Sequence, residues 1–213
     1  MQRVPAPEAQ RRERKKRQTR DALVHAALRL FNAHGYDHTA VREITDAVDV
    51  SERTFFRYFA SKEDLALSFS RESTDAFLRE LASRPSAEPP FEALNNSFRT
   101  SLRTFISDEE QAGDESVYLL VMRLIDTTPS LLAALLRYMH DRDEEITRVL
   151  AAREGVDADA DRRPRLAVAA HSALVIAANR EWRTGDDASA EGVLAAFDAY
   201  AGQLGPALSG HWS

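Results

Sequence analysis

One short segment of this chain combines hydroxyl, guanidinium and aromatic groups at a helical spacing. Residues 50–65 read Val-Ser-Glu-Arg-Thr-Phe-Phe-Arg-Tyr-Phe-Ala-Ser-Lys-Glu-Asp-Leu. In a helix, Phe55 and Phe59 fall on one face, which must be buried. The other side then presents two guanidiniums and two hydroxyls, those of Arg53, Thr54, Arg57 and Tyr58. A short helix that is held by aromatic residues and carries such groups outward has the chemistry of a DNA major-groove reader.

The flanking residues supply the helix starts and the turn that such a reader needs. Ser51 is a good N-cap for the segment, and Ser61 with Asp64 forms a capping-box-like pattern for the following helix. Upstream, residues 39–48 form a second short amphipathic pattern, and residues 49–51 form a tight turn between the two. This order predicts a helix-turn-helix, in which the first helix crosses the DNA backbone and the second enters the major groove.

Residues 17–65 resemble the DNA-binding domain of the tetracycline-repressor (TetR) family of bacterial transcription regulators. Residues 19–31 are similar to its first helix, Gly35-Tyr36 to the end of that helix, residues 39–44 to its second helix, and residues 50–65 to the recognition helix and its exit. The resemblance implies a dimeric regulator, most often a repressor. It places the DNA contacts on Thr39, Arg42, Ser51, Arg53, Thr54, Phe56, Arg57, Tyr58 and Lys62.

These contacts divide into two kinds, because phosphate contacts position a protein and base contacts specify the sequence. We expect Arg53, Thr54 and Arg57 near base edges, and Tyr58 and Lys62 on phosphates. For Arg42, as for Arg57, the alternative is a solvated surface charge.

The sequence departs from the TetR pattern at two positions. Asp49 stands where the family usually has glycine in the turn. Aspartate tolerates a left-handed backbone better than most residues, so the turn should form at small cost. Phe56 stands where many members carry a tyrosine that bonds a phosphate. Phenylalanine cannot make that bond, and we expect it to pack on a sugar or a thymine methyl group.

Charge is distributed unevenly along the chain, whose formal net charge is −6. Residues 1–62 hold 13 of the 28 Lys and Arg and 8 of the 34 Asp and Glu, a net charge of +5, so residues 63–213 carry −11. This asymmetry indicates that one end meets DNA. Residues 1–16 are expected to be a basic disordered arm that follows phosphates or enters a minor groove; the alternative is a solubilising tail. A membrane-surface role is disfavoured, since large apolar residues are not interleaved with the charges.

Several other classes of protein are disfavoured by composition. The chain has no cysteine, which excludes disulfides, thiolate nucleophiles and cysteine zinc sites. Neither a transmembrane run nor a secretory signal is visible, and we expect a cytoplasmic location. Motifs for hydrolases, metalloproteases and nucleotide binding are missing. His34 and His38 are four apart, but Gly35 should end the helix between them. We therefore expect no enzyme, no cofactor and no metal site.

The remaining pattern predicts an all-α protein of about nine helices, with a helix-turn-helix domain over residues 17–62 and a helical effector-binding and dimerisation domain over residues 63–213. Apolar spacing and proline positions predict a long helix opened by Ser61, others over 91–105, 115–125, 129–154, about 164–182 and about 188–204, and a polar loop over 107–114. The helix from 166 is apolar nearly all round, so it requires cover on every side. With the last helix it is expected to form a dimer interface; the alternative is an intrachain core.

Candidates for effector contacts are polar residues stranded on apolar helices, together with apolar neighbours. They are Tyr118, Met122, Arg123, His171 and Asn179. Arg123 could hold a carboxylate or phosphate, because a guanidinium in apolar surroundings must be paired. The alternatives are an ion pair with Asp126 for Arg123, and structural roles for the others. An effector-independent regulator or architectural DNA-binding protein is the competing function.

Overall fold

The structure, a computed structural model, describes residues 7–110, 121, 122, 124, 125, 127–184 and 189–209. The chain divides into two compact units, residues 1–70 with 117–135, and residues 71–116 with 136–213. The described parts of these units contain nine complete helices and no strand, in agreement with the all-α prediction. The predicted domain boundaries at residues 16 and 62 stay predictions.

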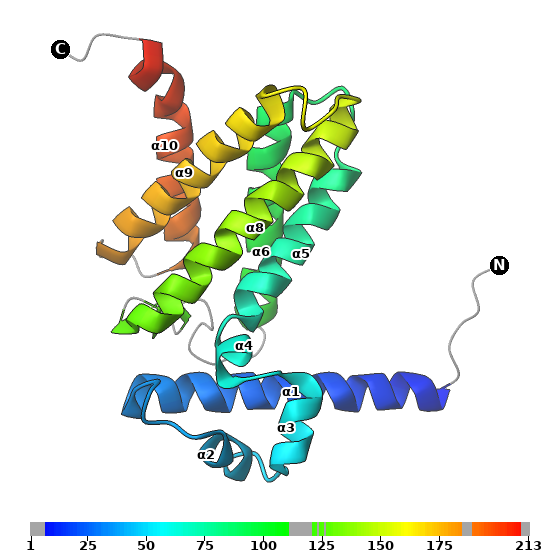
Figure 1. The fold of residues 1–213 in the computed structure, drawn as a ribbon, viewed down its shortest axis with the longest axis vertical. Coiled ribbons are helices and arrows are strands. Elements are labelled where there is room, and N and C mark those ends of the chain that lie inside the picture. Colours follow the sequence, from blue (N-terminus) through cyan, green and yellow to red (C-terminus); the bar gives the residue numbers. More distant parts are fainter. Residues whose placement is uncertain (1–6, 111–120, 123, 126, 185–188, 210–213) are drawn as a thin grey trace. The chain divides into compact units, whose positions relative to one another are not determined.

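The first unit is built around helix α1 (Pro7–His34). Helices α2 (Val41–Asp46) and α4 (Lys62–Ala66) pack on α1, and α3 (Glu52–Tyr58) packs on α2. Figure 1 shows α2 and α3 on one side of α1. The core of this unit consists of fully buried apolar side chains from all four helices and the loops beside them, including Leu23, Ala27, Leu28, Phe31, Ile44, Phe55 and Leu65.

Helix α1 corrects the expectation for the basic arm. Residues 7–16 are its first turns, so this stretch is helical rather than disordered, and residues 1–6 lie outside the described residues. The physical reason is that Arg, Lys, Gln and Glu are good helix formers, and a helix started farther along the chain can propagate through them without a new nucleation step. The basic side chains of residues 14–17 are therefore exposed along a helix that projects beyond the core residues of α1.

The second unit contains the larger parts of α5 (Ser68–Ser83) and α8 (Pro129–Glu154), together with α6 (Pro90–Glu110), α9 (Arg163–Thr184) and α10 (Ala190–Ser209). Helix α9 packs on α6 and on α10, beside which it lies in Figure 1. One core cluster joins α5, α6, α8 and α9 through Phe77, Leu81, Ala93, Leu94, Ile146, Leu150 and Val168. A second cluster joins α9 and α10 around Ala178 and Phe197.

Helix boundaries test the sequence predictions in detail. Pro129 begins α8, and Gly155 follows its end with a φ of 68°, as a left-handed C-terminal residue should. The long helix predicted from Ser61 is instead two helices, because it breaks at Leu67, where φ is −92° and ψ is 1°. The predicted loop 107–114 is wrong over residues 107–110, which belong to α6, and its remainder lies outside the described residues.

The predicted helix over 115–125 is described only in part. Residues 121, 122, 124 and 125 are helical, and the other predicted positions lie outside the described residues. No described helix combines the length and the apolarity that a bilayer span requires.

Candidate DNA-binding surface and ligand cavity

The turn before α3 has the geometry that its sequence predicts. Asp49 adopts a φ of 52°, the left-handed conformation expected where glycine is usual. The backbone N–H of Val50 then donates to the carbonyl of Thr45 at 3.0 Å. Ser51 caps α3, since its hydroxyl accepts a hydrogen bond from the Thr54 N–H at 3.2 Å. The start of α3 is thus tied to the end of α2 by backbone and side-chain bonds.

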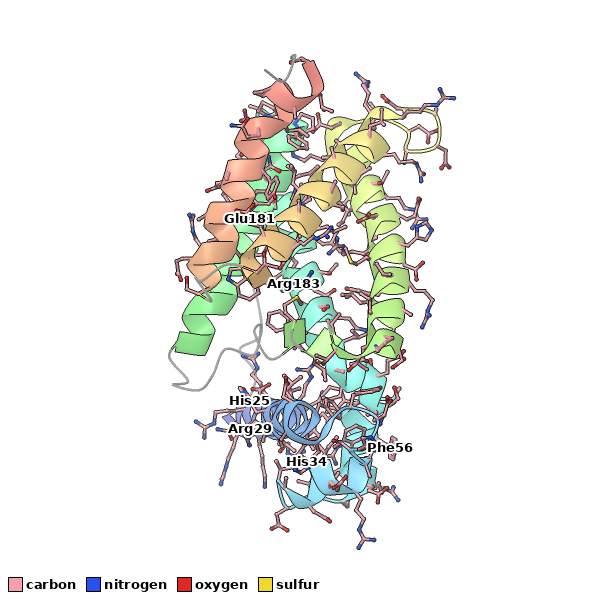
Figure 2. All side chains as sticks on the ribbon, turned by 90° about the vertical axis from the view of Figure 1, so that its left-hand side faces the viewer. His25, Arg29, His34, Phe56, Glu181 and Arg183 are labelled. Carbon is pink, nitrogen blue, oxygen red and sulfur yellow. The ribbon has the colours of Figure 1, made fainter. Side chains whose placement is uncertain are left out.

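Helix α3 separates an aromatic inner face from a polar outer face. Phe55 is 0% exposed, and its ring lies 5.6 Å from that of Phe59. The neighbouring Phe56 is 54% exposed (Figure 2), and Arg53 and Arg57 are exposed as well. Burial of the inner aromatic side chains fixes the orientation of the helix, so the outward groups are held on a rigid support.

The outward polar groups of α3 are organised in pairs. The Thr54 hydroxyl lies 3.0 Å from that of Ser51. Arg57 donates to the Tyr58 hydroxyl at 3.3 Å, and its guanidinium carbon lies 5.0 Å from the centre of the tyrosine ring. Each pair limits the positions its members can adopt, which reduces the conformational entropy cost when such groups bind a partner.

Two of the predicted DNA-binding residues bond through their side chains to backbone carbonyls of the α1–α2 turn. Thr39 is 1% exposed, and its hydroxyl donates to the Gly35 carbonyl at 2.9 Å. The Lys62 ammonium donates to the carbonyls of Tyr36 and Thr39 at 2.7 and 3.3 Å, and it lies 4.3 Å from the centre of the Tyr36 ring. Both side chains therefore fasten the α1–α2 turn, and Lys62 connects that turn to α4.

The environment of Tyr36 supports this structural role. Burial raises the pKa of its phenol to about 12, and the negative charges of Glu63 and Asp37 contribute in the same direction. Arg42, by contrast, is exposed near the start of α2, and its described ion pair is a 3.8 Å contact with Asp46, which is also exposed. Exposed pairs of this kind contribute little to stability, so Arg42 remains available for a phosphate.

The second unit contains a partly open cavity of about 50 Å³ between α5, α6, α8 and α9. Its apolar walls are Phe77, Phe98, Ile146 and Val175. The polar and charged residues of its lining are Ser73, Thr74, Ser101, Arg142 and His171. Arginine and histidine side chains facing an apolar space are the kind of convergent polar groups that orient a small ligand.

His171 is a neutral imidazole at the centre of an aromatic cluster. It is 3% exposed, and its ring stacks on Phe77 at 5.6 Å with an interplanar angle of 25°. Burial lowers the pKa of His171 to about 3, and the positive charges of Arg142 and Arg99 lower it further. Nδ1 lies 3.0 Å from the Asn95 side-chain oxygen, and because that oxygen can only accept, Nδ1 carries the proton.

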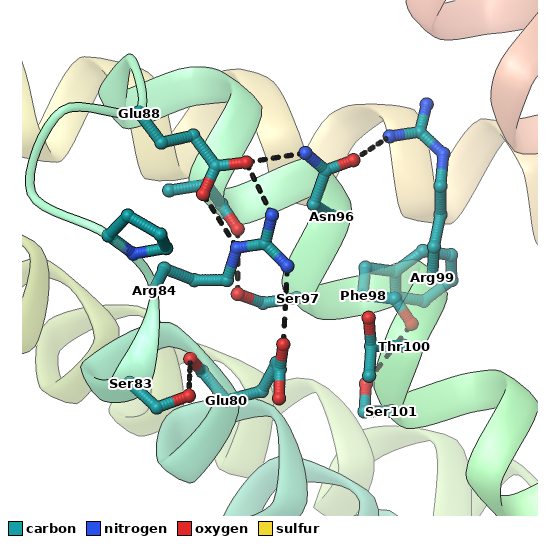
Figure 3. A network of polar contacts seen from close by, with 12 residues as sticks. Glu80, Ser83, Arg84, Glu88, Asn96, Ser97, Phe98, Arg99, Thr100 and Ser101 are labelled. Carbon is teal, nitrogen blue, oxygen red and sulfur yellow. Dashed lines mark hydrogen bonds and ion pairs between the residues drawn. The ribbon is translucent and has the colours of Figure 1, made fainter.

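A polar network lies on the outer side of α6 and connects it with α5 and α10. Arg84 donates to Glu88 and Glu80, and Glu88 also accepts from Asn96 (Figure 3). The Arg84 guanidinium is the main reason that the pKa of Glu88 falls to about 2. Asn96 in turn accepts from Arg99, whose guanidinium pairs with an Asp198 oxygen at 2.7 Å. These charges are satisfied within the fold.

The predicted effector contacts are only partly brought together. His171 lines the cavity, whereas Asn179 and Met122 are not in its lining; Asn179 donates instead to the Val175 carbonyl of its own helix at 2.9 Å. Tyr118 lies outside the described residues, and nothing is described of the Arg123 side chain.

Arg142 is the charged residue of the cavity lining, and the sequence predictions missed it. It lies in a strongly charged stretch and so resembles a surface residue. A signal was nevertheless present, since Arg142 is spaced four and seven residues from the apolar Ile146 and Val149 and hence shares their face.

The outer face of α9 is apolar. Leu166 is 68% exposed and Ile176 is 51% exposed, and Ala169 and Ala173 are exposed between them at helical spacing. The prediction that this helix needs cover on every side is therefore not satisfied by the described part of a single chain.

Comparisons with known proteins cover most of the chain. Residues 23–69 match the family model described as bacterial regulatory proteins, tetR family, and residues 88–206 match the MftR C-terminal domain. The HTH-type transcriptional regulator TcmR of Streptomyces glaucescens is 42% identical over 201 residues, which cover 94% of this chain and 89% of that protein. The HTH-type transcriptional repressor AcnR of Corynebacterium glutamicum is 27% identical over 128 residues, 60% of this chain and 62% of that protein.

Solved structures agree on the fold. A TetR-family regulator from Mesorhizobium loti has a TM-score of 0.51 at 19% identity and covers 88% of this chain and 96% of its own. A regulator from Aquifex aeolicus has a TM-score of 0.52 at 16% identity, over 87% and 99% of the two chains.

Proposed function

Because the chain belongs to the TetR family of helix-turn-helix transcription regulators, we propose that it is a ligand-responsive repressor that binds a palindromic DNA operator as a homodimer in the cytoplasm. The observation that carries the DNA-binding assignment is the construction of α3. Its N-terminus is capped by Ser51, Phe55 anchors it, and Arg53, Phe56 and Arg57 are exposed on its outer side.

The DNA contacts that we propose for the individual residues follow from the exposure of each side chain. Arg53, Thr54 and Arg57 read base edges, with Phe56 on a sugar or a thymine methyl group, and Tyr58 contacts a phosphate. Ser51 helps to hold Thr54 in place. Arg42 and the basic residues at the start of α1 supply further phosphate contacts.

Thr39 and Lys62 act differently from the other residues proposed for DNA binding. Their side chains hold the α1–α2 turn and α4 together, so their contribution to DNA binding is made through the position of α3. This assignment revises the phosphate contact that we predicted for Lys62 from the sequence.

The proposed dimer rests on the apolar outer face of α9. A face with Leu166 and Ile176 largely exposed is typical of a surface that is covered in an assembly. A two-fold dimer would present two α3 helices to successive major grooves, roughly 34–36 Å apart. Repression is proposed because AcnR is named a transcriptional repressor and TcmR a transcriptional regulator.

The cavity in the second unit provides the proposed ligand response. We propose that a ligand binds one arrangement of α5, α6, α8 and α9 more tightly than another. Its binding would shift dimers from an α3-to-α3 spacing that fits DNA to one that does not. The size of the response is limited by that difference in affinity.

The test is selection of genomic fragments by the purified protein, followed by footprinting. We expect protection of an inverted repeat, and loss of that protection in Ile176→Asp, which places a charge on the α9 face. Leu136→Asp is the matched control, because Leu136 is also exposed but lies on α8, outside the predicted dimer interface. Sedimentation should show a dimer for the parent and a monomer for Ile176→Asp. A parent protein that enriches no site, or a monomer that still protects both half-sites, would contradict the proposal.

A further inference from the structure

Arg142 is a cation without an adequate anionic partner in the described part of the chain. Its Nε is buried and makes no hydrogen bond, and its ion pair is a 3.5 Å contact between Nη2 and Asp143. Asp143 also accepts a hydrogen bond from Ser172 at 2.9 Å, so that carboxylate is shared. A buried donor left unbonded is costly, and a guanidinium is best satisfied by an anion that accepts two parallel hydrogen bonds.

Arg99 offers a comparison within the same unit. It lines a larger, more polar hollow of about 430 Å³ with Glu92, Asn96 and Asp198. There, the guanidinium donates to Asp198 at 2.7 Å and to Asn96 at 2.9 Å. Arg99 is therefore well paired. Arg153 also has a buried Nε without a hydrogen bond, but its terminal nitrogens donate to Glu154, Pro85 and Glu88. Among the described residues, Arg142 has only the 3.5 Å contact with Asp143.

The charge of the cavity lining is that of one guanidinium. No acidic side chain belongs to the lining among the described residues, and His171 is neutral with its proton on Nδ1. The second imidazole nitrogen keeps its lone pair and adds no positive charge. A single delocalised negative charge would balance the lining.

The rest of the lining determines what the anionic group can be attached to. Phe77, Phe98 and the His171 ring are aromatic surfaces, and Ile146 and Val175 are aliphatic. Such walls favour a flat apolar body over a sugar or a peptide. The volume of about 50 Å³ accommodates a head group, since one water occupies on the order of 10–15 Å³ by the same measure.

From these features we propose that the cavity accepts a ligand with one carboxylate or acidic phenolate on an aromatic body, and that the Arg142 guanidinium is the partner of the anion. The proposal rests on the ligand-responsive function above and specifies its ligand class. Since the body of such a ligand exceeds the present volume, its binding would displace wall residues of the cavity. Binding would thereby be linked to a change in the arrangement of α5, α6, α8 and α9.

The test uses full-length protein, calorimetric titration at pH 7.5, and two pairs of probes that differ in charge: benzoate with benzamide, and 2-naphthoate with 2-naphthamide. We expect the anion of each pair to bind roughly tenfold or more tightly than its amide. Arg142→Gln should remove that preference. Arg148→Gln, which changes an exposed arginine of the same helix, should retain it.

Arg142→Lys keeps the charge and provides a second variant if Arg142→Gln does not fold, as judged by circular dichroism. We expect it to keep a preference for the anions at several-fold lower affinity, because an ammonium cannot make the bidentate contact. Equal affinity of the parent for acid and amide, no binding of either acid, or an unchanged preference in Arg142→Gln would overturn the proposal. A folded Arg142→Lys variant without any preference would also overturn it.

Footprinting separates this proposal from the regulatory function. If the parent protects an operator but does not distinguish acids from amides, the ligand class is wrong and the regulator remains. If the parent prefers the acids but enriches no DNA site, the regulatory function is wrong and the cavity assignment remains.

Discussion

The two units of this chain differ in which of their charged and apolar side chains are exposed. In the first unit, Phe55 and Phe59 are buried, and the guanidiniums of Arg53 and Arg57 are exposed. In the second, Arg142 faces a cavity, while Leu166 and Ile176 on α9 are exposed. The proposals rest on this difference: exposed cations suit a phosphate backbone, a partly buried cation suits a small anion, and an exposed apolar face suits another protein surface.

The largest expected difference is between two adjacent residues of α3, the buried Phe55 and the exposed Phe56. Phe55→Ala should lower the free energy of unfolding by about 3–5 kcal/mol, because a fully buried aromatic side chain is removed from the core. Phe56→Ala should change stability by less than about 1 kcal/mol and should weaken operator binding instead. Urea unfolding and a DNA titration of both variants would measure this. Similar losses of stability in the two would mean that Phe56 has a structural role.

The outward side of α3 should carry sequence recognition. Arg57→Ala is expected to weaken operator binding by about 1–3 kcal/mol and binding to random DNA much less, since a base contact discriminates between sequences. The measurement is competition between operator and random duplexes, with Arg148→Ala as an exposed control outside the first unit. If Arg57→Ala lowers both affinities equally, Arg57 contacts phosphate and does not read bases.

His171, which is buried in the second unit, should make the folding stability of the protein depend on pH. Between the folded pKa of about 3 for His171 and its ordinary value of 6.5, the unfolded chain binds a proton that the folded chain does not. Stability therefore rises with pH across this window and is constant with respect to this group above it.

From pH 6.5 down to 5.0 we expect stability to fall by roughly 1.6 kcal/mol because of this group, as the slope approaches about 1.4 kcal/mol per pH unit below the ordinary pKa. His171→Gln should remove that part of the slope, and His140→Gln, an exposed site on α8, should not. Glu88 does not interfere, because a pKa lowered to about 2 from an ordinary 4.5 changes stability mainly below this range. A parent slope that His171→Gln leaves intact would show that other groups cause it.

The smallest expected effect concerns the start of α1. Removing residues 1–16 should reduce the slope of log affinity against log salt by about one unit for each phosphate that this stretch neutralises, and should leave the protected site unchanged. Footprints and salt titrations of the truncated and full chains would measure both quantities. An unchanged salt slope would make this stretch a solubilising segment only.

Much of the first unit was predictable from the sequence, because the residues that form its turn, its helix cap and its exposed helix face are close together in the chain. The Ser51 cap, the left-handed Asp49 and the alternation of buried and exposed faces on α3 depend on residues within a few positions of one another. The same local reasoning assigned a phosphate contact to Lys62, whose partners Tyr36 and Thr39 lie 26 and 23 residues earlier in the chain. Local spacing could not reveal these acceptors, because they are distant from Lys62 in sequence.

The sequence by itself determined the helical class, the basic and acidic ends, the helix-turn-helix and the apolar character of α9, since each depends on composition or on spacing within one helix. Only the tertiary structure decided that Arg142 and His171 share a cavity and that Thr39 is buried. The physical reason is that a cavity is lined by one or two residues from each of several helices. Which of those residues meet depends on how the helices pack, so it cannot be predicted from the sequence of one helix.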